Sequence, residues 1–252
     1  MAAIADTMDK VVLTDPGRKR KFVRGMFDGI AGTYDLLNHL LSAGIDVVWR
    51  RKTVDLLDPK PGWRVLDLAT GTGDLGFEAA SRDREITVTG ADVSVGMLRH
   101  GVQKERTRDE RLRFLAGDAE GLPFPDTSFD GVTIGFGIRN VAELDRGLQE
   151  IGRVLKADGR LAVLEFSKPR TPIVRGIYFL YFKHILPLIG KVISKDPGAY
   201  TYLYESVMMF PEGDAFCAHL AEAGFEDIQQ ISLTFGIASI YVCRKGGGAG
   251  LV

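Results

Sequence analysis

Residues 65–76 read VLDLATGTGDLG, an apolar run that leads into three closely spaced glycines, Gly71, Gly73 and Gly76. The apolar part predicts a buried strand over 63–68, and the residues after the second glycine predict a helix over about 74–82. Glycines between a strand and a helix let the backbone approach a ligand closely, with the helix N-terminus facing it. The stretch therefore predicts a ligand-binding turn at the first strand of an α/β fold.

Outward from this turn, predicted strands and helices alternate along the chain. Such alternation indicates a doubly wound α/β fold with a mostly parallel sheet, which binds ligands at the carboxyl ends of its strands. The link around Gly236 is so short that it permits only an antiparallel hairpin, which would complete a sheet of seven strands. Strands are expected near 63–68, 86–91, 112–116, 129–134, 160–166, 228–233 and 237–243, and helices near 74–82, 94–108, 141–155 and 212–223.

Composition and charge narrow the class of protein. The chain has 252 residues, 45% hydrophobic and 26% charged, as expected for one globular domain. Its formal net charge of −1 lacks a basic excess, so no nucleic-acid partner is expected. Cys217 and Cys243 form neither a zinc-binding nor a disulfide pattern, and no cluster of side chains suggests a metal site. With no signal peptide, transit peptide or long apolar run, we expect a cytoplasmic, bacterial protein.

The glycine turn alone leaves two cofactor classes open. Its spacing matches the pattern that binds dinucleotides, and the same kind of turn also binds S-adenosylmethionine. Asp92 ends the second predicted strand, where an acidic residue binds a ribose diol in either class. On these features an NAD-dependent oxidoreductase and a methyltransferase are equally supported.

Further acidic residues favour S-adenosylmethionine. The carboxylates of Asp67 and Asp74, on either side of the turn, would oppose the negative pyrophosphate of a dinucleotide. The methionine part of S-adenosylmethionine carries an ammonium and a sulfonium, which suit these carboxylates. Asp118 follows the third predicted strand and is expected to accept a hydrogen bond from the adenine amino group, with the backbone of Ala119 beside it.

Several longer motifs carry a family resemblance. The motifs are MFDGIAGTYDLLNHLLSAGIDVVWR (26–50), VLDLATGTGD (65–74), GDAEGLPFPDTSFD (117–130), GFGIRNV (135–141) and RVLKADGRLAVLEFSKP (153–169). Over about residues 22–245 the chain that carries them resembles the ubiquinone/menaquinone C-methyltransferase family. The glycine turn is shared by many methyltransferases, whereas the N-terminal motif together with FGIRNV and LEFSKP is highly specific to this family.

The resemblance implies a fold, an activity and a set of cofactor contacts. The fold is that of class I S-adenosylmethionine-dependent methyltransferases, with a seven-stranded, mostly parallel sheet and an antiparallel C-terminal strand. The activity is methylation of a ring carbon of a polyprenylated benzoquinol or naphthoquinol, and we favour demethylmenaquinol over a ubiquinone precursor. Gly135 departs from the family, in which many members have serine there, so one side-chain contact to the cofactor is lost. The expected cofactor-binding residues are Asp67, Gly71, Thr72, Gly73, Asp92, Asp118 and Ala119, of which Thr72, Asp92, Asp118 and Ala119 match the family's own contacts.

Carbon methylation requires an electron-rich ring carbon, and a quinol becomes more nucleophilic when a hydroxyl ionises. A free phenol has a pKa of about 10, and an opposite charge within about 4–6 Å lowers such a pKa by roughly 1–3 units. Arg139 lies just after the fourth predicted strand, where the methyl acceptor should bind, so we interpret it as a phenolate stabiliser. A purely structural pairing of Arg139 is the alternative, and Glu165 is expected to pair within the fold.

The N-terminal region is expected to fold over the site. Residues 1–57 form a helical lid segment in this interpretation, 58–245 a Rossmann-like methyltransferase domain and 246–252 a flexible tail. Within the lid, Tyr34 either hydrogen-bonds a quinol oxygen or simply packs. His39 either accepts a proton near neutral pH or is structural. The basic run 18–21 is expected to be solvated.

The segment from Ser167 to Lys195 has six basic residues and no acidic one, together with many apolar residues. Two interpretations stay open: a helix buried against the sheet, and an interfacial element that rests on anionic lipid at the inner face of the cell membrane. The prenylated substrate favours a peripheral membrane contact. The sequence predicts no oligomeric state, although a homodimer is compatible with it.

Overall fold

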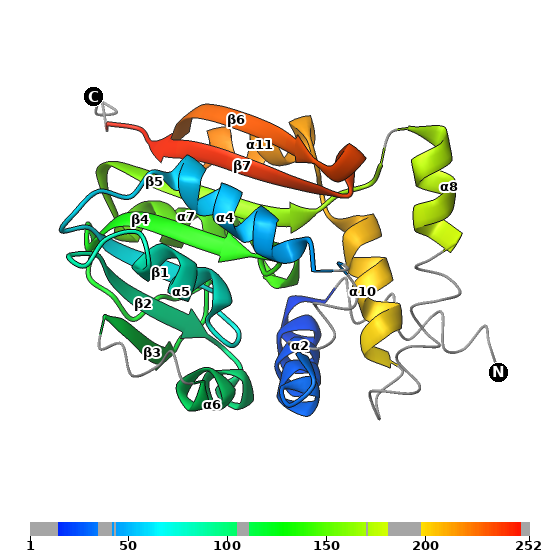
Figure 1. Ribbon diagram of the computed structural model, residues 1–252, viewed down its shortest axis with the longest axis horizontal. Coiled ribbons are helices and arrows are strands. Elements are labelled where there is room, and N and C mark those ends of the chain that lie inside the picture. Colours follow the sequence, from blue (N-terminus) through cyan, green and yellow to red (C-terminus); the bar gives the residue numbers. More distant parts are fainter. Residues whose placement is uncertain are drawn as a thin grey trace.

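A seven-stranded sheet forms the centre of the molecule (Figure 1). A computed structural model of the chain describes residues 15–34, 42, 44–104, 111–169, 171–180 and 198–247. The strand order is β3-β2-β1-β4-β5-β7-β6. The strands are β1 (Arg64–Leu68), β2 (Thr87–Asp92), β3 (Leu112–Ala116), β4 (Phe129–Gly135), β5 (Leu155–Phe166), β6 (Phe225–Leu233) and β7 (Ala238–Lys245).

The strand directions agree with the sequence prediction. β1 pairs in parallel with β2 and β4, and the pairs β2–β3 and β4–β5 are also parallel. β7 runs antiparallel to both β5 and β6. The predicted α/β sheet, mostly parallel with an antiparallel C-terminal strand, is therefore confirmed. β5 begins at Leu155 rather than near 160, and its pairing with β4 shifts register between Phe129 and Gly131.

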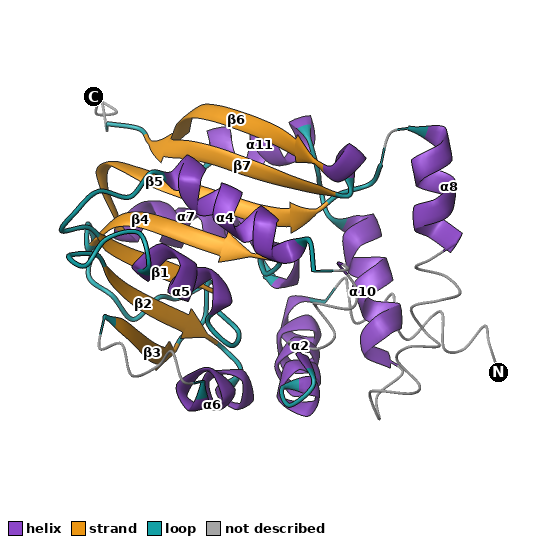
Figure 2. Cartoon of the chain, viewed as in Figure 1, coloured by secondary structure: helices purple, strands orange, loops and turns teal. Residues whose placement is uncertain are grey.

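Helices cover both faces of the sheet (Figure 2). On one face, α4 (Asp46–Leu57) and α5 (Asp74–Ala80) contribute to a buried cluster that includes Val54, Leu57 and Leu75. On the other face lie α7 (Leu144–Val154) and α11 (Asp214–Glu222), whose apolar residues pack on β4 and β5. α6 (Val95–Gln103) packs against β2 and β3. Burying a Leu or Val side chain contributes about 1.5–3 kcal/mol, so these two layers hold the sheet rigid.

Further helices lie beyond the carboxyl ends of the parallel strands (Figure 1). They are α2 (Pro16–Ile30), the short helix η2 (Ile138–Asn140), α8 (Pro172–Leu180) and α10 (Gly198–Met209). α2 starts sharply because Asp15 caps it through the Arg18 amide at 2.8 Å and Pro16 occupies its first turn. Its buried face packs against Tyr178 of α8 and Tyr202 of α10.

The predicted lid segment 1–57 contains two helices with different surroundings. α2 lies over the carboxyl edge of the sheet, next to α6 and η2. α4 instead packs on the sheet, where Val54 and Leu57 are fully buried. Of these two helices, only α2 therefore lies where it can cover the strand ends. His39 lies outside the described residues, as do the tail from 248 onward and most of the segment from Ser167 to Lys195 beyond α8.

The described part of that basic segment leaves both interpretations open. Tyr178 is buried, with 5% of its surface exposed, whereas Arg175 is exposed and Leu180 is 58% exposed. Within the described ranges, no helix combines the length and the apolar character needed to cross a bilayer.

Candidate cofactor and substrate site

A main pocket of about 670 Å³ opens at the carboxyl edge of the sheet, between the strand ends and α2. A side pocket of about 340 Å³ adjoins it beside the glycine turn. Four of the predicted cofactor-binding residues line the main pocket, namely Gly71, Asp92, Asp118 and Ala119. Asp67 and Thr72 line the side pocket instead.

Gly73, the remaining predicted contact, shapes the turn rather than lining either pocket. Gly71 and Gly73 both adopt left-handed backbone conformations, with φ of 57° and 91°. A side chain at Gly73 would also place its Cβ 2.7 Å from the ring of Phe114. Glycine at these two positions is therefore required by the geometry of the turn, independently of any ligand.

Asp92 holds the turn as well as facing the main pocket. Its Oδ2 accepts a hydrogen bond from the Gly71 amide at 2.8 Å, and its Oδ1 accepts one from the Ser94 amide at 2.8 Å. Burial raises the pKa of Asp92 above its usual range, although these amide hydrogen bonds act against the shift. Because each carboxylate oxygen has two lone pairs, Asp92 can still accept hydrogen bonds from a ribose diol.

Asp67 lies beneath the turn, fully engaged with the protein. Its carboxylate accepts hydrogen bonds from the hydroxyls of Thr70, at 2.5 Å, and Thr133, at 2.8 Å. Burial raises the pKa of Asp67 to about 6. Each oxygen keeps a further lone pair, and the expected direct contact with a cationic ligand stays a prediction.

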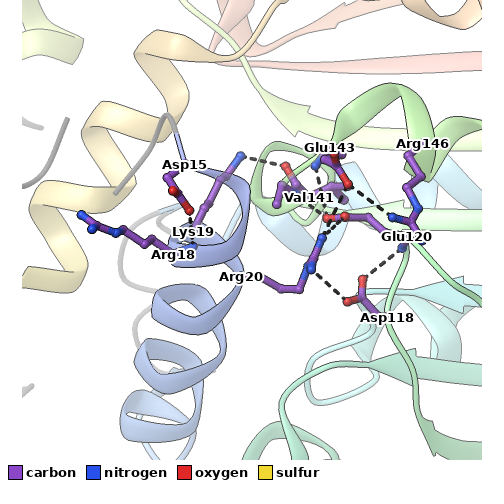
Figure 3. Close-up of polar contacts among 10 residues, drawn as sticks. Asp15, Arg18, Lys19, Arg20, Asp118, Glu120, Val141, Glu143 and Arg146 are labelled. Carbon is purple, nitrogen blue, oxygen red and sulfur yellow. Dashed lines mark hydrogen bonds and ion pairs between the residues drawn. The ribbon is translucent and has the colours of Figure 1, made fainter. Parts of the chain in front are cut away.

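Asp118 lies at the rim of the main pocket, facing α2 (Figure 3). Arg20 of α2 forms an ion pair with Asp118 at 3.5 Å, another with Glu143 at 3.7 Å, and a short hydrogen bond to Glu120. Glu120 also accepts hydrogen bonds from the amides of Ala142 and Glu143. Burial raises the pKa of Glu120, but these hydrogen bonds together hold it below its usual range.

Lys19 makes a second link from α2 to the loop after β4. Its Nζ donates a hydrogen bond to the Arg139 carbonyl at 3.0 Å. It donates another to the Val141 carbonyl at 2.7 Å (Figure 3). Burial lowers the pKa of Lys19 to about 8, with Glu120 opposing and Arg139 adding to the shift. The basic run 18–21 was expected to be solvated, which is wrong for Lys19, whereas Arg20 stays exposed while it forms its ion pairs. The four successive basic residues were the only sequence signal of these contacts.

Arg139 is buried and paired. Its Nη1 donates a hydrogen bond to Glu165 Oε1 at 2.6 Å, with 7% and 0% of the two side chains exposed. Among the described residues its Nε has no hydrogen-bond partner. The expected pairing of Glu165 within the fold is confirmed. Arg139 does not line the main pocket, so its role as a phenolate stabiliser stays a prediction beside the structural pairing seen here.

Two tyrosines lie near the Arg139 charge. Burial raises the pKa of Tyr178 and of Tyr202, while the positive charge of Arg139 acts in the opposite direction. The Tyr202 hydroxyl donates a hydrogen bond to Asn140 Oδ1 at 3.1 Å, and Asn140 lines the main pocket. Sequence reasoning missed this contact from α10, since nothing near Tyr202 marks a site.

Tyr34 and Gly135 line both pockets. The Tyr34 ring packs edge-on against Phe27 of α2, with 5.9 Å between ring centroids. A Cβ at Gly135 would lie 3.1 Å from the side chain of Leu75. Leu75 therefore occupies part of the space that a side chain at position 135 would need. Tyr34 thus lines the site and packs within it, and its contact with a ligand stays a prediction, whereas its companion His39 lies outside the described residues.

Comparison with known proteins decides between a methyltransferase and an NAD-dependent oxidoreductase. Residues 14–245 match the ubiE/COQ5 methyltransferase family. The chain belongs to this family. The expectation of an S-adenosylmethionine-dependent C-methyltransferase is thereby confirmed, and the alternative of an NAD-dependent oxidoreductase is set aside.

Individual relatives agree with the assignment. A demethylmenaquinone methyltransferase from Thermus thermophilus is 48% identical over 217 residues, covering 86% of this chain and 98% of the relative. A ubiquinone/menaquinone biosynthesis C-methyltransferase UbiE from Geotalea uraniireducens is 45% identical, covering 92% and 99%. A solved S-adenosylmethionine-dependent methyltransferase from Thermotoga maritima shares the fold, with a TM-score of 0.62 and 19% identity over 88% of this chain and 99% of that one.

Proposed function

We propose that this protein methylates a ring carbon of a polyprenylated quinol, with demethylmenaquinol as the preferred substrate. The observation that carries the proposal is the lining of the main pocket. Asp92, Asp118 and Ala119, which match the family's cofactor contacts, line this pocket. Asn140 and Tyr34 line the same pocket. Relatives named demethylmenaquinone methyltransferase support the naphthoquinol over a benzoquinol.

The residues of the main pocket fit the proposed methyl donor. Asp92 accepts hydrogen bonds from the ribose, and Asp118 accepts one from the adenine amino group. The apolar side chains of Phe27, Leu68 and Met97 enclose the rest of the volume. When bound, S-adenosylmethionine would supply the methyl group as an electrophile at its sulfonium, and loss of the sulfur–methyl bond would leave S-adenosylhomocysteine.

The protein's part in the chemistry is to favour an ionised quinol and to exclude water. The ring carbon donates its electron pair to the incoming methyl group, and the same carbon then releases its proton to water so that the ring regains aromaticity. Arg139 stabilises the phenolate as an electrostatic neighbour, and its pairing with Glu165 fixes the guanidinium in place. Tyr34 hydrogen-bonds the quinol oxygen from the other side of the pocket. Helix α2 is the lid that closes over both ligands.

The proposal is tested with purified protein, labelled S-adenosylmethionine and demethylmenaquinone supplied with and without dithionite under anaerobic conditions. Only the quinol has an ionisable hydroxyl, so we expect label in the ring product only when reductant is present. A benzoquinol precursor, run in parallel, should be methylated more slowly. Equal transfer to the oxidised quinone, or no transfer to either, would contradict the mechanism.

A peripheral contact with the membrane follows from the apolar tail of this substrate. Exposed Arg175 and Leu180 on α8 support it, because a basic and an apolar residue together suit an anionic lipid surface. We expect salt-sensitive co-sedimentation with anionic vesicles that weakens in Arg175→Glu. Equal binding of the parent protein to neutral and anionic vesicles would rule this contact out.

A further inference from the structure

The lining of the side pocket includes a charged residue that was not among the predicted cofactor-binding residues. It adjoins the main pocket, since Tyr34, Gly135 and other residues line both. Its far wall includes Arg50, the only arginine or lysine among its lining residues in the described part of the chain. A ligand whose ribose and adenine lie against the main pocket has room for its remaining end in the side pocket.

Arg50 brings a largely buried guanidinium to this wall. Its side chain is 10% exposed, and its Nη1 lies 2.6 Å from Asp46 Oδ2 and 3.4 Å from Asp74 Oδ2. Within the described ranges, neither its Nε nor its Nη2 donates a hydrogen bond. A guanidinium carries five N–H donors in a rigid fork. Arg50 therefore keeps donors for a further acceptor in addition to its two carboxylate neighbours.

Asp74, the acidic neighbour of Arg50 in the turn, is already neutralised from two sides. Lys104 donates a hydrogen bond to Asp74 Oδ1 at 2.6 Å and another to the Thr72 hydroxyl at 2.8 Å. The lining also includes Asp67, whose two oxygens accept hydrogen bonds from threonine hydroxyls. The amino-acid end of the methyl donor is a zwitterion, so its ammonium suits these carboxylates while its carboxylate can accept from the donors of Arg50.

We propose that Arg50 binds the α-carboxylate of the methionine part of S-adenosylmethionine. The proposal rests on the proposed function and extends it to the amino-acid end of the methyl donor. A planar guanidinium matches a carboxylate geometrically, which a point-like ammonium does not. Arg50 thus favours ligands that carry an amino-acid end. Asp92 and Asp118 bind the adenosine part, which is present in ligands with and without that end.

Isothermal titration with two ligands separates this role from a structural one. S-adenosylhomocysteine carries the α-carboxylate, whereas 5′-methylthioadenosine has the same adenosine and sulfur but no amino-acid end. In Arg50→Met we expect the affinity for S-adenosylhomocysteine to fall roughly 10- to 100-fold. The affinity for 5′-methylthioadenosine should change by less than about threefold.

Two further variants test whether a loss of affinity comes from the guanidinium of Arg50 or from damage to the fold. Arg50→Lys keeps a charge beside Asp46, so the fold is retained, yet it loses the fork and should still bind S-adenosylhomocysteine several-fold more weakly. Arg51→Met changes the next residue of α4, whose side chain is 66% exposed, and should leave both affinities unchanged. Thermal unfolding of each variant reports whether the fold is intact.

The outcomes are distinguishable. Equal losses for both ligands in Arg50→Met and Arg50→Lys, or no loss for either ligand, would overturn the assignment of Arg50 and leave the proposed function standing. Failure of the unchanged protein to bind S-adenosylhomocysteine would overturn the proposed function, and the assignment of Arg50 with it.

Discussion

The floor and the roof of the main pocket are held by different kinds of contact. The floor consists of the strand ends and turns at 67–73, 92–94 and 135–138, and the roof is helix α2. Floor contacts are buried: Asp92 holds the Gly71 amide, and Asp67 holds two threonine hydroxyls. Roof contacts are partly exposed, with 42% of the Arg20 side chain accessible.

This difference predicts where the site opens. A hydrogen bond to a buried charged group contributes about 1.5–3 kcal/mol, whereas an exposed ion pair contributes about 0–1 kcal/mol and is weakened by salt. We therefore expect the floor to be preformed and ligands to enter and leave by movement of α2. Changes in the floor should lower stability and binding together, while changes in the roof should alter exchange of ligand.

The largest effect is expected in the floor, at Gly137. A Cβ there would lie 2.5 Å from the Cβ of Ala69, which itself has a φ of 53°. In Gly137→Ala the two turns must move apart, so the free energy of unfolding should fall by about 1–3 kcal/mol, and turnover by roughly 100-fold. Urea unfolding and a methyl-transfer assay measure both.

Gly121→Ala is the matched control, since a Cβ at Gly121 has no atom within 4 Å. It should change neither quantity measurably. If Gly137→Ala behaves like Gly121→Ala, the floor is not the rigid part of the site.

Asp92→Asn is the second floor variant. An asparagine keeps one acceptor oxygen but turns an amino group toward either the Gly71 or the Ser94 amide. We expect at least a tenfold loss of affinity for S-adenosylhomocysteine, because the charge-assisted hydrogen bonds to the ribose are lost. Unfolding free energy should also fall by about 1–2 kcal/mol. An unchanged calorimetric affinity would remove Asp92 from the ribose site.

How far the sequence predicts the site also differs between floor and roof. Gly71, Gly73 and Asp92 were predictable because the strand–turn–helix pattern places them locally. The partners of Asp67 were not, since Thr133 lies on β4 and meets Asp67 only through strand pairing. The contact between Arg20 and Glu120 was harder still to predict, because the two residues are far apart in the sequence. They meet only because helix α2 lies across the carboxyl edge of the sheet. Periodicity reports local structure, and it carries no information on such long-range contacts.

The ends of the strands were also predicted with uneven success. The strand at 112–116 was predicted to the residue, whereas β5 was predicted from 160 and begins at Leu155. The turn at Asp158 and Gly159 looked like a strand boundary, but the strand passes through it with a shift of register against β4. Arg139 was predicted from its motif, and its pairing with Glu165 depends on where β5 ends.

In the roof, Arg20→Met should change the rate of ligand exchange more than stability. Loss of the contacts to Asp118, Glu120 and Glu143 frees α2 from both loops. We expect dissociation of S-adenosylhomocysteine to accelerate about three- to tenfold, with a change in unfolding free energy of no more than about 1 kcal/mol. Stopped-flow competition gives the rate. Arg18→Met is the control, since Arg18 points away from these loops (Figure 3), and a dissociation rate that is equal in the two variants would show that Arg20 does not hold the roof.

The smallest effect is expected at Lys19, as a dependence of stability on pH. The folded-state pKa of Lys19 is lowered from 10.5 to about 8, so its contribution to stability is fully present above pH 10.5 and is lost as the pH falls through about 8. The neutral amine still donates hydrogen bonds to the carbonyls of Arg139 and Val141. Relative to Lys19→Met, the parent protein should therefore gain stability between pH 8 and pH 10.5. Because Lys19 is partly exposed, we expect a gain of no more than about 1 kcal/mol. Urea unfolding of both proteins across this range measures it, and a parallel pH dependence in the two would mean that the Lys19 amine stays solvated and charged, with the roof held by Arg20 alone.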